Sequence, residues 1–191
     1  VGEKGTLIHL AEGRGRAMDS GTSENLYGVW PDRVSGRVWA IGASGVILRG
    51  NGKRWVTERP PEGKGLRAIA GSDPARLWAV GDGGTILARQ RDGKWRKESV
   101  GTRADLLSLG ITPDGDVFAG DRDGGLWRRA PLATPNQTRW RKVEAPGIGP
   151  LRAIRGLPWV KARPIPRDAR YIAPSEIPLP TEAAYSLDPD D

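Results

Sequence analysis

Short apolar runs recur along the chain and are separated by clusters of Gly, Pro, Asp and Asn. The runs are rich in Val, Ile, Leu and Trp, and the polar clusters break them about every 8–12 residues, a pattern typical of short β-strands joined by turns. No segment keeps the apolar stripe of a helix over about 11 residues. The pattern therefore predicts an all-β chain.

The strand pattern also repeats. The stretch RLWAVGDGGTIL at 76–87 is matched by RVWAIGASGVIL at 37–48 and DVFAGDRDGGLW at 116–127, and the chain opens in the same register with VGEKGTLIHL. A second element also recurs, as NLYGVW, LRAIAG, LLSLGI and LRAIRG. Its leucines are spaced 40, 40 and 45 positions apart, at Leu26, Leu66, Leu106 and Leu151. A period near 40 residues is the signature of a repeat architecture.

Each repeat contains four predicted strands, in the order LRAIAG, RLWAVG, GTILAR and KWRKES for the second copy. The middle two are almost continuously apolar, as strands covered on both faces are. The outermost carries Lys94, Arg96 and Lys97 around Trp95, the charged rim of an exposed edge. Four short antiparallel strands form one propeller blade. We therefore predict a β-propeller with four visible four-stranded repeats, of which the first is incomplete and the others span residues 26–65, 66–105 and 106–150.

The glycines of Gly81-Asp82-Gly83-Gly84 resemble a phosphate-binding loop at first sight. Such a loop needs a following helix and usually a Lys-Ser/Thr pair, and this stretch has neither. Because the stretch recurs in every copy, we expect a structural hairpin in which Asp-Gly supplies the positive φ angles of a type I′ turn. Equivalent turns are predicted at 42–45, 81–84 and 121–125.

The run LWAVGDGGTIL at 77–87, followed by DGKW at 92–95, resembles the blades of the BNR/Ycf48-like group of β-propellers. The resemblance covers roughly residues 1–156 and implies the propeller fold, although four copies are fewer than the group's usual six or seven blades. The group includes assembly factors, binding modules and, more distantly, sialidase-type glycosidases. The sialidase Asp-box, Ser-x-Asp-x-Gly-x-Thr-Trp, lacks its leading Ser in every copy here. The resemblance also favours an extracytoplasmic location, periplasmic or secreted.

Both ends of the repeat region are incomplete. Val1 aligns with Val80, so the chain starts midway through a blade, and residues 151–156 are an isolated first strand. Two arrangements satisfy this strand: it lies beside residues 1–10 and closes a four-bladed ring, or it lies beside another chain that completes a larger propeller.

Residues 157–191 differ from the repeats and are predicted to form a separate arm. They contain seven prolines and no glycine, which favours extended chain over helix or interior strand. The arm is also more apolar than a typical disordered segment. We expect it to pack against a surface through Trp159, Tyr171, Ile172, Ile177 and Leu179.

Charge is distributed unevenly. Residues 1–170 hold all 30 Lys and Arg and 18 of the 23 acids, a net charge of +12, whereas residues 171–191 hold five acids and no base. A basic body indicates an acidic partner, such as an acidic protein face, a nucleic acid or an anionic lipid. GC-rich codon usage would also produce this Arg-rich composition. No run approaches the roughly 18 apolar residues of a membrane span.

Two groups of residues are candidates for binding. Arg67 and Arg152 share a position in the innermost strand with Tyr27, and there they are expected to line the mouth of a central channel and to bind an anion, or else to be plainly solvated. Loop bases, among them Arg54, Arg91 and Arg129, are expected to gather at the opposite end, either as a phosphate- or acid-binding patch or as a plainly solvated surface. Trp127 does not recur among the repeats and is a candidate for an exposed binding contact or for local packing.

The sequence contains no cysteine and one histidine, His9, so it offers no thiolate metal site and no repeated His-based catalytic site. We expect no catalytic residues, no metal and no cofactor. The predicted function is a non-enzymatic protein–protein interaction module, a scaffold or accessory subunit. One alternative is a glycan-binding or sialidase-like propeller, which needs a pair of carboxylates. The other is nucleic-acid binding by the basic face, for which an exposed aromatic series is missing.

Overall fold

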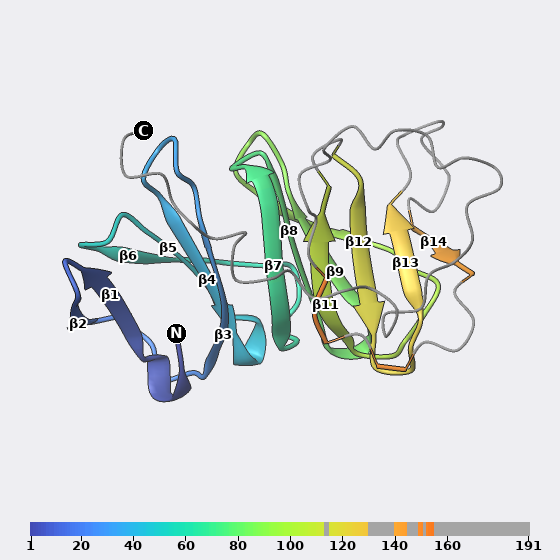
Figure 1. Ribbon diagram of the computed structural model, residues 1–191, viewed down its shortest axis with the longest axis horizontal. Helices are drawn as coiled ribbons and strands as arrows, with labels where there is room; N and C mark the ends of the chain where they lie inside the picture. The colour runs from blue at the N-terminus through green and yellow to red at the C-terminus, as the bar shows by residue number, and fades with distance from the viewer. Residues whose placement is uncertain (113–114, 130–139, 145–148, 151, 155–191) are drawn as a thin grey trace, which may run out of the picture. The chain divides into compact units, whose positions relative to one another are not determined.

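Three four-stranded antiparallel sheets follow one another in the computed structural model, preceded by a sheet of two strands (Figure 1). The structure describes residues 1–112, 115–129, 140–144, 149–150 and 152–154. The chain divides into two units, Val1–Pro158 and Trp159–Asp191, and every described residue lies in the first.

Within the described residues, each four-stranded sheet has its strands in chain order. The first sheet contains β3 (Leu26–Pro31), β4 (Val38–Gly42), β5 (Ile47–Gly50) and β6 (Trp55–Glu58). The second contains β7 (Leu66–Asp73), β8 (Arg76–Gly81), β9 (Thr85–Arg89) and β10 (Trp95–Glu98). The third contains β11 (Leu106–Ile111), β12 (Val117–Asp121), β13 (Leu126–Arg129) and β14 (Trp140–Val143). The predicted blades are confirmed, and we call these sheets blades 1, 2 and 3.

The opening sheet pairs β1 (Leu7–Ala11) with β2 (Arg14–Met18). A 3₁₀ turn, η1 (Glu3–Gly5), precedes β1 in the same way that η2 (Ala43–Gly45) and η3 (Asp82–Gly84) precede β5 and β9. Strands β1 and β2 therefore correspond to the third and fourth strands of a blade, as the alignment of Val1 with Val80 predicts. We call this two-stranded sheet the half-blade.

The hydrophobic core consists of separate clusters, each shared by two consecutive sheets. The second strand contributes to two of them because its alternate side chains point to opposite faces. In β8, Leu77 and Ala79 pack against blade 1, whereas Trp78 and Val80 pack against blade 3. The innermost strands β3, β7 and β11 also lie side by side. The continuously apolar second strand is thus explained by a neighbour on each side.

The glycine hairpins lie where predicted, but one residue assignment is corrected. Positive φ angles occur at Gly83 (61°) and Gly84 (72°), and the Thr85 amide donates to the Asp82 carbonyl. The central residues of the turn are therefore Gly-Gly rather than Asp-Gly. The third hairpin has a different geometry, in which the Gly125 amide donates to the Asp121 carboxylate at 2.6 Å.

The segment 151–156 differs from its prediction over the residues that are described. Residues 152–154 are not assigned to a strand, and Ile154 packs against Gly110 of β11. Pairing with residues 1–10 is not found for these three residues. Ile154 instead lies against the last blade, as Ile69 of β7 lies against Gly28 of β3.

Candidate functional site

A buried ion-pair cluster joins blade 2 to blade 3. Glu98, at the end of β10, accepts hydrogen bonds from the Arg129 guanidinium at 2.8–3.2 Å and from the Trp140 indole Nε1 at 2.8 Å. The guanidinium carbon of Arg129 lies 5.2 Å from the ring centroid of Trp78. Its charge is therefore held between a carboxylate and an aromatic face.

A second cluster of the same kind joins blade 1 to blade 2. Glu58 accepts from the Arg89 guanidinium at 3.1 and 3.2 Å and from the Trp95 Nε1 at 2.7 Å, and Arg89 lies 5.2 Å from the ring of Trp39. Glu58 also accepts a bond from Arg49 of its own sheet at 2.7 Å. Sequence reasoning missed both glutamates, although the motifs WVTE and WRKE, 40 residues apart, carried the signal.

These contacts leave the carboxylate of Glu58 with a pKa below its usual value of about 4.5. Burial opposes ionisation, but the hydrogen bonds from Arg89, Trp95 and Arg49 and the charge of Arg89 together favour the carboxylate. Because the folded-state pKa is depressed, the stabilisation is fully present above about pH 4.5 and is lost as the pH falls through the folded-state pKa.

We therefore expect Glu58→Gln to melt at a lower temperature than the parent chain near neutral pH, and the difference to shrink below about pH 4.5. Thermal unfolding of both proteins, followed by circular dichroism from about pH 7 to pH 3, measures this difference. A difference that stays constant across the range would show that ionisation of Glu58 does not contribute.

Two of the predicted binding residues are structural. Arg129 has 18% of its side chain exposed and is paired with Glu98, so its place in a surface patch is corrected. Trp127 is 8% exposed and donates its Nε1 to Asp121 at 2.9 Å. In strand register Trp127 is equivalent to Leu48 and Leu87, because all three lie opposite the central alanine of the second strand. Of the two roles expected for Trp127, the structure therefore shows the packing role, because this is a core position.

The innermost-strand residues Tyr27 and Arg67 do meet. The Arg67 guanidinium lies 4.9 Å from the Tyr27 ring centroid and binds Asp82 at 2.8 and 3.3 Å. The hydrogen bond to Asp82 raises the pKa of Arg67. Asp82 therefore engages one edge of the Arg67 guanidinium, formed by Nε and one Nη. Arg152 is exposed.

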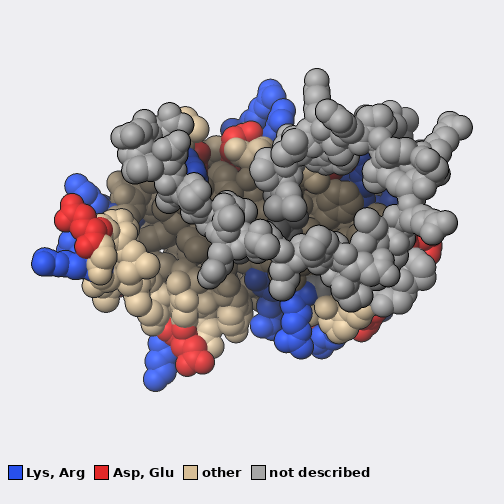
Figure 2. Space-filling model, viewed as in Figure 1, with Lys and Arg blue, Asp and Glu red and all other residues tan. Residues whose placement is uncertain are grey.

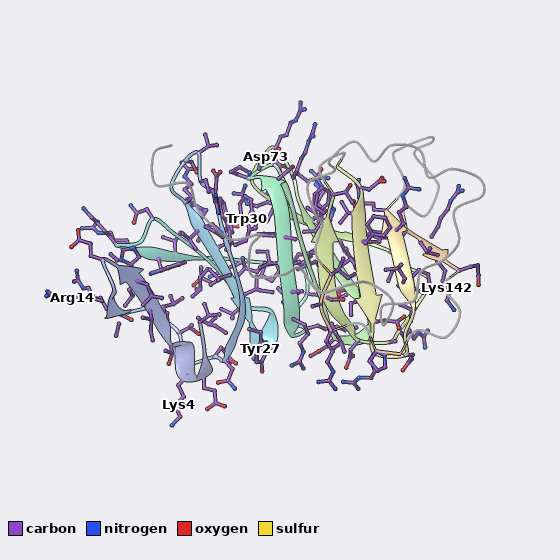
Figure 3. All side chains as sticks on the ribbon, viewed as in Figure 1. Lys4, Arg14, Tyr27, Trp30, Asp73 and Lys142 are labelled. Atoms are coloured by element: carbon purple, nitrogen blue, oxygen red, sulfur yellow. The ribbon has the colours of Figure 1, made fainter. Side chains whose placement is uncertain are left out.

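A groove lies at the opposite end of the sheets, between blades 2 and 3. Figure 3 shows this opposition through Asp73, at the β7–β8 hairpin, and Tyr27, at the other end of the neighbouring sheet. The groove has a volume of about 660 Å³ and is bordered by the hairpins β7–β8, β9–β10 and β11–β12. Its basic lining residues are Arg76, Arg89, Arg91, Arg96 and Arg129, and we call it the Arg91 groove.

The arginines of this groove fall into two sets, partly buried and exposed. Arg89 and Arg129, at its floor, are neutralised by the glutamates between the blades. Arg76 and Arg96 are mostly exposed and have only loose ion pairs, at 3.8 and 3.4 Å. Arg91 is exposed and has no ion pair among the described residues. Figure 2 shows Lys and Arg projecting at both ends of the sheets.

The walls of the Arg91 groove include Ala75, Ala88 and the buried Trp78. The indole Nε1 of Trp78 has no hydrogen-bond partner among the described residues. A buried donor without an acceptor is costly. The groove therefore combines exposed guanidinium groups with a small apolar wall.

Of the predicted loop bases, the structure brings Arg91 into this groove and leaves Arg54 on the exposed β5–β6 hairpin of blade 1. The predicted arm contacts Trp159, Tyr171, Ile172, Ile177 and Leu179 lie outside the described residues. In the described part of the chain, no three His, Cys, Asp or Glu side chains are grouped to hold a metal ion. The described residues also contain no helix long and apolar enough to cross a membrane.

No family model and no curated protein matches the chain. Among solved structures it is similar to one described as "YCF48 bound to D1 peptide", with a TM-score of 0.54 and 18% sequence identity. The match covers 74% of this chain and 48% of that chain, so the chain spans about half the length of the solved structure. At this identity the likeness is one of fold, and it confirms the β-propeller that the repeats predict.

Proposed function

We propose that the chain is a non-enzymatic protein-interaction module that binds an extended, acidic polypeptide segment in the Arg91 groove. The observation that carries the proposal is the convergence of Arg76, Arg91 and Arg96 at the exposed rim of one groove of about 660 Å³. A volume of this size accommodates a few residues of a peptide.

The arrangement of the groove matches such a ligand. Guanidinium groups at the rim bind carboxylates in a planar, bidentate manner. Ala75 and Ala88 offer room for apolar side chains in the wall of the groove. The net charge of +12 over residues 1–170 would steer an acidic partner towards the molecule.

The similarity in fold to the solved propeller structure supports peptide binding as a class of function. The similar solved structure is described as a complex of Ycf48 with a peptide. Peptide binding is thus compatible with this propeller architecture, and we carry only that class of ligand over to the present chain. The preference for acidic segments rests on the arginines of the groove.

The proposal predicts that reversing two rim charges weakens peptide binding. We expect Arg91→Glu/Arg96→Glu to lower the affinity for a labelled peptide of alternating Glu and Leu by about tenfold or more, since each replacement turns an attraction of up to about 1 kcal/mol into a repulsion. Fluorescence anisotropy at fixed salt measures the affinity.

The matched control is Arg103→Glu. Arg103 is exposed and lies between β10 and β11, at the other end of blade 2 from the groove. The substitution changes the net charge without changing the groove. The affinity of this variant for the peptide should therefore stay within about twofold of that of the parent chain. Equal losses in the control would mean that net charge, not the groove, attracts the peptide. No binding by the parent chain would refute the proposal.

A further inference from the structure

The interface between the half-blade and blade 1 lacks the carboxylate that the other two interfaces contain. Strand register identifies the equivalent position: Met18 lies opposite Leu7, just as Glu58 lies opposite Ile47 and Glu98 opposite Ile86. A methionine therefore occupies the position of the interblade glutamate.

The arginine of the cluster is missing from this interface as well. Arg89 and Arg129 lie opposite Trp95 and Trp140 in their sheets, and Gly50 lies opposite Trp55. Both charges are absent together, which avoids leaving one of them buried and unpaired. The tryptophan remains, and the Nε1 of Trp55 is buried without a hydrogen-bond partner among the described residues.

A cleft of about 450 Å³ lies directly beside Met18. Its basic lining residues come from both sides of the interface: His9 and Arg16 from the half-blade, and Lys53 from the β5–β6 hairpin of blade 1. His9 and Arg16 are cross-strand partners, so their side chains share one face of the half-blade.

These three bases are not engaged in ion pairs within the described structure. No ion pair joins any of them to a described carboxylate. The cleft has one acidic lining residue, Asp19, whose carboxylate accepts the Gly21 amide at 2.9 Å. Three donors therefore converge from two sheets on a cleft that provides little negative charge. An oxyanion with several acceptor sites satisfies such an arrangement.

We propose that this cleft binds a carboxylate group, from either a small dicarboxylate or an acidic side chain of a partner. The other two interfaces supply the reason for this chemistry, because each holds a carboxylate at the position next to which this cleft opens. The inference is independent of the proposed function: the cleft lies on the other side of blade 1 and shares no lining residue with the Arg91 groove.

The only histidine of the chain makes the test direct. His9 gives the sole imidazole signals in a proton–carbon NMR spectrum of the full chain, so they need no assignment. We expect these signals to shift and saturate on titration with succinate or with a short Glu-containing peptide. Sodium chloride at equal ionic strength should leave them unchanged. Saturation by the peptide alone would identify an acidic side chain as the ligand, whereas saturation by both would identify the carboxylate itself.

Two variants separate the cleft from general surface charge. Arg16→Gln should weaken saturation by about tenfold through loss of a charge-assisted hydrogen bond. Arg14→Gln, in the same strand but outside the cleft, should bind as the parent chain does. Met18→Glu should place a carboxylate of the chain itself beside the cleft and abolish the titration. Signals that respond to no carboxylate, or equal losses in Arg16→Gln and Arg14→Gln, would overturn the proposal.

Discussion

Glu98→Ala is expected to lower the free energy of unfolding by about 3–5 kcal/mol, because it removes one partner of a buried ion pair. Glu98 is 8% exposed, and its carboxylate receives the Arg129 guanidinium and the Trp140 indole. The substitution leaves a guanidinium charge and an indole donor between two blades with no acceptor. Urea denaturation followed by tryptophan fluorescence measures the loss.

The control for this prediction is an ion pair at the surface. Arg76 lies 3.8 Å from Asp73, and 66% of its side chain is exposed. Arg76→Ala should therefore cost less than about 1 kcal/mol. Similar losses in the two variants would mean that the contacts of Glu98 contribute no more than an exposed pair does.

The second large effect is expected at a turn. Gly84→Ala should lower the free energy of unfolding by about 2–5 kcal/mol. Its φ of 72° is a left-handed conformation, which costs an alanine about 1–2 kcal/mol. A Cβ at this position would also overlap the carbonyl oxygen of Thr102, in the segment leading to blade 3, and such overpacking typically adds about 1–3 kcal/mol.

The neighbouring glycine separates these two causes. Gly83 is also left-handed, at 61°, but a Cβ there would meet only the flexible end of Lys64. Lys4 and Ser44 occupy the equivalent position in the earlier turns with φ of 51° and 53°, so a side chain is accepted. Gly83→Ala should cost about 1–2 kcal/mol at most. A cost for Gly84→Ala no greater than this would contradict the expected contact with Thr102.

The strands and blades could be predicted because their signals are local. Apolar runs such as LWAV and turn glycines occur within a few residues of each other, and the 40-residue period places every copy in register. The two-sided burial of β8 followed from its unbroken apolar sequence. Even the half-blade was predicted, because Gly2 and Gly5 align with Gly81 and Gly84.

The candidate site could not be predicted in the same way, because its contacts cross between blades. Glu98 and Arg129 lie 31 residues apart in two different sheets, and only the packing of blade 2 against blade 3 brings them together. Trp127 has no aromatic counterpart in the other repeats, so its equivalence to Leu48 and Leu87 appears only in the pairing of the sheets. The Arg91 groove likewise combines three hairpins that no sequence period brings together.

The two kinds of interface have a consequence for cooperativity. In a repeat protein, stability is approximately a sum of terms for each repeat and for each contact between neighbours. Blades 1, 2 and 3 are joined by an apolar cluster and an ion pair at each boundary. The half-blade meets blade 1 through apolar contacts around Leu7 and Leu26 and through backbone hydrogen bonds, with no ion pair among the described residues. The contacts that hold neighbouring sheets together therefore differ from one boundary to the next along the chain. We expect the boundary between the half-blade and blade 1 to open more easily than the two boundaries that contain an ion pair.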